Sequence, residues 1–119
     1  MTSRLVGAFG EYVAARELRK KGYDILSVNY SNSVGEIDIV AQKLPYVCFV
    51  EVKTRRGNTM LRPADAVDYH KQENIKSAAA SYMNKYKIKA LLRYDIFEVY
   101  IDENNNVIKT DYLPDAFWG

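Results

Sequence analysis

Apolar and polar positions along the chain predict two helices and four or five strands. Residues 5–21 consist of good helix formers, and a second helical pattern begins after Asp68. Alternation with a period of two, together with β-forming residues, predicts strands over residues 23–30, 36–42, 46–54 and 93–101, and a short strand over 107–110. This order of helix, three strands, helix and one or two strands predicts an α+β fold with a mixed β-sheet flanked by helices.

The two helical segments have recognisable ends. Gly22 follows the basic last turn of the first helix as a C-terminal stop, and Asp68 has the character of an N-cap for the second. The polar stretch over residues 55–66 predicts a loop between the third strand and the second helix. Five residues with helical spacing in the second helix predict a core stripe: Ile75, Ala78, Ala79, Tyr82 and Tyr86. Lys71, four residues before Ile75, continues this stripe.

The second and third strands should form a hairpin that carries its charges on one side. Every second residue of a strand shares a face. In the second strand, the apolar face is then Ile37, Ile39 and Ala41, and the other face is Glu36, Asp38 and Val40. In the third strand, the charged face is Val47, Phe49, Glu51 and Lys53.

The pairing register of this hairpin brings two carboxylates together. If Gln42 pairs with Val47, antiparallel pairing places Asp38 opposite Glu51, whereas a shorter loop places Glu36 opposite Glu51. Like charges directly opposite each other are destabilising unless a positive charge lies between them. Either register therefore points to a bound cation.

Asp38 and Glu51 are candidate ligands for Mg²⁺ or Mn²⁺, because these hard cations prefer carboxylate oxygens. Glu36 is a candidate outer ligand. Lys53 shares the face of Glu51, and phosphodiester hydrolysis needs an activated nucleophile and relief of phosphoryl charge, which a metal and an ammonium group supply. The structural alternative is a solvated Glu51–Lys53 ion pair on an exposed sheet face.

Glu11 and Lys71 extend the candidate site to the helices. Glu11 falls on the same stripe of the first helix as Ala8, Ala15 and Leu18, where a carboxylate needs a partner. It can act as a further metal ligand or water-orienting group, or it can pair with an arginine. Lys71 is either a phosphate contact or a lysine whose stem lies along the core.

Composition limits the classes of protein that the chain can represent. Its 119 residues are 48% hydrophobic and 27% charged, which predicts one globular domain over residues 1–119. No apolar run could cross a bilayer, the start lacks a secretion signal, and Cys48 is a single cysteine, so we expect a reducing cytoplasm.

The net charge of +2 means that any basic surface is local, as around residues 16–21 and 53–62. A single histidine, His70, leaves zinc chemistry and a histidine-based triad unsupported.

Several segments resemble the YraN family of small bacterial proteins in their order and spacing. They are Gly10-Glu11, Gly35-Glu36-Ile37-Asp38-Ile39-Val40-Ala41, Phe49-Val50-Glu51-Val52-Lys53-Thr54-Arg55, Ala66-Val67-Asp68, Lys71 and Arg93-Tyr94-Asp95. The resemblance spans nearly the whole chain.

This resemblance implies membership of the restriction-endonuclease-like, PD-(D/E)XK, superfamily and a similarity to archaeal Holliday-junction resolvases. The implied fold is a three-layer α/β/α nuclease core. In it Asp38 and Glu51 bind metal, Lys53 assists the attacking water, and Glu11 completes the site. Ile37, and not the proline of the superfamily pattern, precedes Asp38, but that proline is often missing across the superfamily and bears no chemistry.

The expected function is a Mg²⁺- or Mn²⁺-dependent endonuclease that acts on DNA, branched or damaged, during recombination or repair. Arg55, Arg56 and Lys71 are expected to hold phosphates, which contributes affinity rather than sequence specificity. A resolvase-like role requires two active sites and hence a two-fold homodimer. The alternative is a non-catalytic nucleic-acid-binding or adaptor module on the same fold, and RNA is a further candidate substrate.

Overall fold

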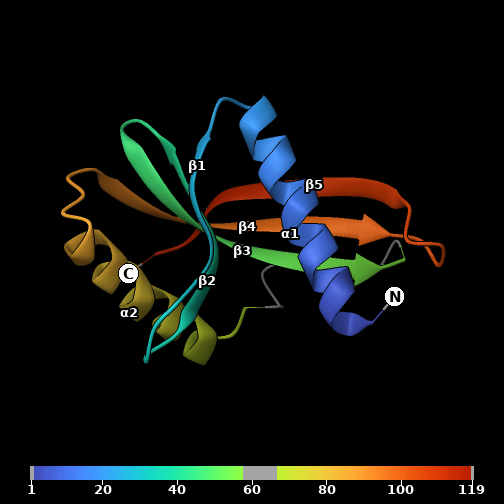
Figure 1. Cartoon of the computed structure of the whole chain (residues 1–119), viewed down its shortest axis with the longest axis horizontal. Coiled ribbons are helices and arrows are strands. Elements are labelled where there is room, and N and C mark those ends of the chain that lie inside the picture. Colours follow the sequence, from blue (N-terminus) through green and yellow to red (C-terminus); the bar gives the residue numbers. More distant parts are fainter. Residues whose placement is uncertain (1, 58–66, 119) are drawn as a thin grey trace.

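The computed structural model describes residues 2–57 and 67–118, which form a five-stranded β-sheet with one helix on each face (Figure 1). The elements are α1 (Ser3–Lys20), β1 (Asp24–Ser31), β2 (Glu36–Lys43), β3 (Tyr46–Arg56), α2 (Tyr69–Lys85), β4 (Leu91–Ile101) and β5 (Val107–Phe117). The strands lie in sequence order, and only β3 and β4 are parallel, because α2 lies in the crossover between them. The predicted α+β class and element order are confirmed.

Two apolar clusters separate the sheet from its helices and produce three layers. Under α1, the first cluster includes Val13, Ala14, Leu18, Ile39, Ala41, Cys48 and Val50. Under α2, the second cluster includes Val40, Val47, Phe49, Ile75, Ala78, Ala79, Tyr82 and Ile96. Both faces of the central strands are therefore buried, as expected of a sheet that contains a parallel pair. Neither helix in the described ranges is long and apolar enough to cross a membrane.

The helices differ from their predicted packing at two positions. Tyr86 was expected in the core stripe of α2, but it is the C-cap of the helix and is 52% exposed. Ala8 was expected on the buried stripe of α1, but it is exposed, because α1 packs through Gly10, Val13 and Ala14. The helix begins at Ser3, two residues earlier than predicted, because the side chain of Thr2 accepts a hydrogen bond from Leu5 N.

The hairpin register is the longer-loop alternative, since Gln42 pairs with Val47 and Ala41 with Cys48. The alternative that opposed Glu36 and Glu51 is wrong. Ile37 also departs from its predicted face: it packs with Val40 beneath α2 rather than with Ile39 and Ala41. The change of face occurs beyond Ile39, where the β2–β3 ladder has ended and β2 remains paired with β1 alone, so that the two strands twist away from β3.

Two strands are longer than predicted. β3 continues through Arg55 and Arg56, which pair with Tyr100 and Ile101 of β4, so the predicted loop begins too early. The rest of that loop, residues 58–66, lies outside the described residues. β5 continues to Phe117 instead of ending at residue 110, and the backbone N–H of Asp115 donates to the buried Asp95 carboxylate of β4.

Candidate functional site

Asp38 lies where β2 and β3 separate. The backbone ladder ends with Ile39 opposite Val50, and Asp38 Oδ2 then accepts a hydrogen bond of 2.8 Å from Val52 N. The carboxylate thus takes the place of the next ladder contact and attaches β2 to β3 one residue beyond Glu51. The structure brings Asp38 and Glu51 to the same place, through a side chain rather than through direct backbone pairing.

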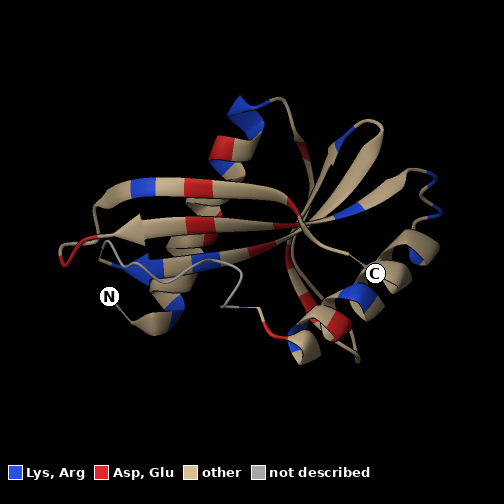
Figure 2. Cartoon of the chain, turned by 180° about the vertical axis from the view of Figure 1, so that it is seen from behind, with Lys and Arg blue, Asp and Glu red and all other residues tan. Residues whose placement is uncertain are grey.

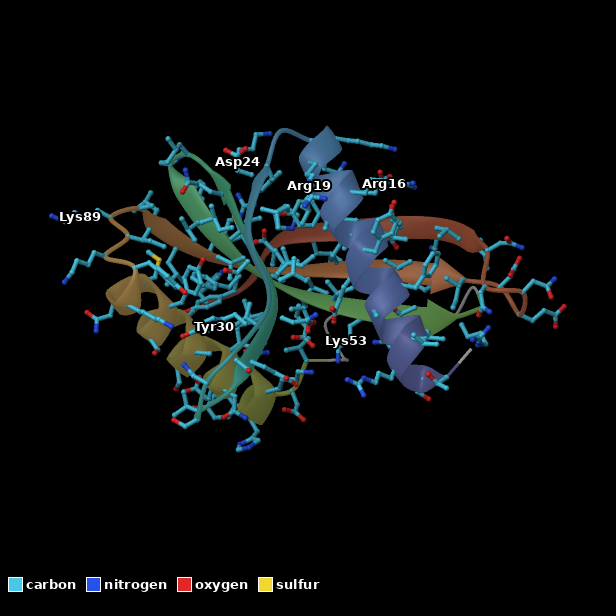
Figure 3. All side chains as sticks on the ribbon, in the orientation of Figure 1. Arg16, Arg19, Asp24, Tyr30, Lys53 and Lys89 are labelled. Carbon is cyan, nitrogen blue, oxygen red and sulfur yellow. The ribbon has the colours of Figure 1, made fainter. Side chains whose placement is uncertain are left out.

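Glu51 is nearly buried, with 4% exposure, and two lysines neutralise it. Its Oε1 atom lies 2.7 Å from Lys71 Nζ and 3.5 Å from Lys53 Nζ. Lys53 comes from β3, whereas Lys71 comes from the first turn of α2, where Asp68 caps the helix by accepting from Lys71 N at 2.8 Å. Figure 3 shows Lys53 on β3, beside α1 and near the beginning of α2.

Burial and neighbouring acids change the electrostatics of the carboxylates. Burial, followed by the charge of Glu51, raises the pKa of Asp38 to about 7, against the hydrogen bond from Val52 N. Burial also raises the pKa of Glu11, and the charges of Glu51 and Glu36 add to it, while hydrogen bonding with Asn29 opposes the rise. Burial is thus the main cause of both raised pKa values, and mutual repulsion among the acids adds to it.

The two lysines respond in opposite directions. Burial lowers the pKa of Lys53, and the neighbouring Lys71 ammonium lowers it further, against the charge of Glu51. Burial also disfavours the charge of Lys71, but its hydrogen bond with Glu51 outweighs this effect and raises its pKa. Lys71 therefore lies closer to Glu51 and keeps its proton more strongly, whereas Lys53 loses its proton more easily.

These side chains line an open cavity of about 490 Å³. The predicted site residues that line it are Glu11, Asp38, Glu51, Lys53, Arg56 and Lys71. Glu36 lines a neighbouring cavity, is exposed, and affects the site through its charge on Glu11. The structure therefore assembles most of the predicted site and leaves Glu36 at its edge.

Close packing of α1 against β3 positions Glu11. A Cβ atom on Gly10 would collide with Thr54 Oγ1, so a larger residue there would force the Thr54 side chain or the helix to shift. Glu11 is the next residue, and it reaches the cavity from the opposite layer to Lys71. The roles of Thr54, Val52 N and Asn29 could not be predicted from sequence, because each is a contact between different elements rather than a local pattern.

The predicted phosphate contacts have different surroundings. Arg55 Nε lies 2.9 Å from Glu98 Oε2, and Glu98 is fully buried and also accepts from Tyr100 OH. Arg55 thus compensates a charge inside the sheet. Arg56 is exposed and donates to Asp102 O and to Asn105 Oδ1. Glu98 is one of two buried acids of β4, the other being Asp95, and alternation along the strand gave no sign that Arg55 would be its partner.

Among residues 2–57 and 67–118, the basic residues do not form one continuous face around the site. Figure 2 shows acidic and basic residues mixed along the strands and along α2. Arg16 and Arg19 lie towards the C-terminal end of α1, away from Lys53 (Figure 3). The local basic groups of the cavity are thus Lys53, Arg56 and Lys71.

Comparison with known proteins identifies the family. The family model described as uncharacterised protein family UPF0102 matches residues 10–99, a span that contains every predicted site residue. The chain belongs to the UPF0102 family. This confirms the predicted membership of the YraN family.

Relatives in UPF0102 match along almost their full length. A UPF0102 protein of Caldicellulosiruptor bescii is 42% identical over 120 residues, which cover 98% of this chain and 100% of the relative. One of Caldanaerobacter subterraneus subsp. tengcongensis is 40% identical over 119 residues, covering 98% of each chain. One of Clostridium beijerinckii is 36% identical over 113 residues, covering 94% of this chain and 92% of the relative.

The donor set in this UPF0102 chain fits a divalent cation held by two protein carboxylates. Asp38 and Glu51 line the same cavity, and the pKa of Asp38 is raised first by burial and then by the charge of Glu51, both of which a bound cation would offset. Within residues 2–57 and 67–118, no three side chains of His, Cys, Asp or Glu converge as a metal cage. This arrangement suits Mg²⁺, which commonly uses one or two carboxylates and keeps other positions for water and substrate phosphate.

Proposed function

We propose that the chain is a Mg²⁺- or Mn²⁺-dependent endonuclease that hydrolyses DNA phosphodiester bonds, and that it belongs to the restriction-endonuclease-like superfamily. The observation that carries this proposal is the convergence of Asp38, Glu51 and Lys53 in one cavity, where burial and mutual charge perturb two of the three groups. Its three-layer fold, with the acids on adjacent strands, supports the same assignment.

Asp38 and Glu51 are the residues that would hold the metal, with Glu11 beside them. When bound, a divalent cation supplies charge stabilisation to the phosphoryl group and favours ionisation of a water molecule at neutral pH. Asp38 already commits one oxygen to Val52 N, which fixes the orientation of its carboxylate before any ligand arrives. This pre-organisation is what a site for charge stabilisation requires.

Lys53 has the position and protonation behaviour of a group that orients the attacking water and accepts its proton. Burial lowers its pKa, so its neutral form is more accessible than that of an exposed lysine. The water oxygen forms a bond to phosphorus as the bond to the leaving oxygen breaks, and the leaving oxygen takes up a proton. Lys71 and Arg56 are the groups that we assign to substrate phosphates, while Arg55 is engaged by Glu98.

DNA with branched or damaged structure is the proposed substrate, and recombination or repair is the proposed context. A junction-cutting role places two such sites in a two-fold homodimer. A non-catalytic nucleic-acid-binding module is the second candidate function. It is favoured by one observation: the ammonium groups of Lys71 and Lys53 lie 2.7 Å and 3.5 Å from Glu51 Oε1, so two side chains of the protein compensate this carboxylate.

The test is incubation of the purified chain with labelled duplex, flap and four-way DNA and with matched RNA, in Mg²⁺, Mn²⁺ or EDTA. The nuclease assignment predicts cleavage of DNA that EDTA abolishes and that Asp38→Ala and Glu51→Ala each remove. Salt-sensitive binding without turnover in either metal would favour the binding module. Cleavage that persists in both variants would show that Asp38 and Glu51 do not form the active site.

A further inference from the structure

A second cavity, of about 550 Å³, adjoins the candidate active site. The β1–β2 turn and the first turns of α2 form its walls, and we call it the turn cavity. Its lining includes Ser33, Val34, Glu36, His70, Asn74 and Ile75. Lys71 lines both cavities, so the turn cavity meets the active site at the lysine that contacts Glu51.

The wall formed by the β1–β2 turn is well ordered. Asn32 Oδ1 accepts from Val34 N at 3.0 Å and from Gly35 N at 3.1 Å, and Asn32 N donates to Gly35 O at 3.0 Å. Gly35 also lies against the backbone of α2, since a Cβ atom there would be 2.7 Å from Asn74 O. The turn and the helix thus hold each other in place, and the cavity exists before any ligand binds.

The chemistry of the lining suits a flat, neutral ligand with polar edges. The 51%-exposed Val34 offers apolar surface above the buried Ile75, while Ser33 and Asn74 offer hydroxyl and amide groups. The carboxylates of Glu36 and Asp68 also line the cavity, and they disfavour a phosphate inside it but can accept hydrogen bonds from amino groups. A nucleobase has these properties, and its phosphate would remain towards Lys71.

We propose that the turn cavity binds the base of an unpaired nucleotide next to the scissile phosphate. This inference rests on the proposed nuclease function and narrows its substrate class. The cavity is in the size range of small-ligand sites, and a base can enter it only from outside the duplex stack. The substrate is therefore DNA that presents an unpaired nucleotide at the cut, as a flap, a bulge or a junction does.

Binding can be tested without cleavage, by recording amide chemical shifts of the full chain in EDTA with 2′-deoxyadenosine 5′-monophosphate. The expected result is shifts clustered in residues 32–36 and 70–75, absent with 2-deoxyribose 5-phosphate, which lacks the base. Asn74→Tyr, which fills the cavity, should weaken binding at least tenfold. Asn84→Tyr, the same change at an exposed position near the end of α2, should not. Equal shifts with both ligands would overturn the proposal.

Cleavage gives an independent readout. Replacing the unpaired nucleotide by an abasic residue should slow cutting about tenfold, because binding of the base away from the reacting atoms then no longer positions the phosphate, whereas an abasic residue deep in the duplex should not. Equal rates for both substrates would overturn the base-binding cavity but leave the nuclease assignment intact. Base-dependent binding in the turn cavity with no cutting of any DNA would instead support the cavity and contradict the nuclease.

Discussion

Lys71 Nζ lies 2.7 Å from Glu51 Oε1, so the first turn of α2 supplies a positive charge to a nearly buried carboxylate on β3. In the proposed enzyme, a divalent cation and this ammonium group act on the same carboxylate. Lys71 therefore stabilises the metal-free site and competes with the metal for Glu51. This relationship links the stability of the protein to metal binding.

Lys71→Gln should make the protein more dependent on metal for its stability. In EDTA, loss of the ammonium should lower the free energy of unfolding by about 1 kcal/mol, because Lys71 is partly exposed and solvent screens the pair. Added Mn²⁺ should then raise the melting temperature more in Lys71→Gln than in the wild type. Lys76→Gln, which breaks the Glu73 pair on the same helix, is the control. An equal or smaller Mn²⁺ response in Lys71→Gln would contradict the competition.

Asp38→Asn should change the pH dependence of stability. The pKa of Asp38 is raised to about 7, so its favourable contribution is complete below about pH 4 and is lost as the pH rises through 7. Asparagine removes this loss and can still accept from Val52 N. In EDTA at pH 8, the variant should be more stable than the wild type by roughly 1–3 kcal/mol, since each pKa unit corresponds to about 1.4 kcal/mol.

Denaturant unfolding at pH 5 and pH 8 measures this difference. Asp24→Asn, which changes an exposed acid on β1, serves as the control and should leave the pH profile parallel to that of the wild type. If Asp38→Asn and the wild type lose the same free energy of unfolding between the two pH values, the pKa of Asp38 is not raised in the folded protein.

Gly10→Ala should disrupt the contact that positions Glu11. The new methyl group would meet Thr54 Oγ1, and overpacking of this kind costs about 1–3 kcal/mol. Gly7→Ala is a matched control in the same helix, because nothing lies within 4 Å of its added Cβ. That variant should gain about 0.5–1 kcal/mol from better helix propensity. Thermal unfolding distinguishes them, and equal shifts would contradict the close approach of α1 to β3.

Arg55→Gln should reduce stability rather than only DNA affinity. The change leaves the fully buried Glu98 without its cation, which costs about 3 kcal/mol, whereas Arg56→Gln at the exposed next position should stay within about 0.5 kcal/mol. Urea unfolding and DNA binding should be measured together. If Arg55→Gln stays stably folded and binds DNA less tightly than Arg56→Gln, the main role of Arg55 is to contact phosphate rather than to compensate Glu98.

The hairpin and its charged face were predictable from sequence because they follow from one loop and one alternation, whereas the choice between the two registers needed the structure. The loop and the alternation identified Asp38 and Glu51 as candidate site residues. Glu11 and Lys71 were identified because each is a charged residue on an otherwise apolar helical stripe. Contacts between segments that are far apart in the sequence could not be predicted. Pairing of β3 with β4 requires a crossover through α2, so the Arg55–Glu98 contact has no local signature. Ile37 changes face because the ladder stops, which alternation alone cannot reveal.

The central claim is that Asp38 and Glu51 share one divalent cation, and anomalous diffraction from crystals soaked in Mn²⁺ tests it most directly. The account predicts a manganese peak bound by both carboxylates, weakened in Asp38→Asn, with Lys71 moved away from Glu51. A well-ordered site in which Lys71 stays on Glu51 and no manganese peak lies between the two carboxylates would contradict it.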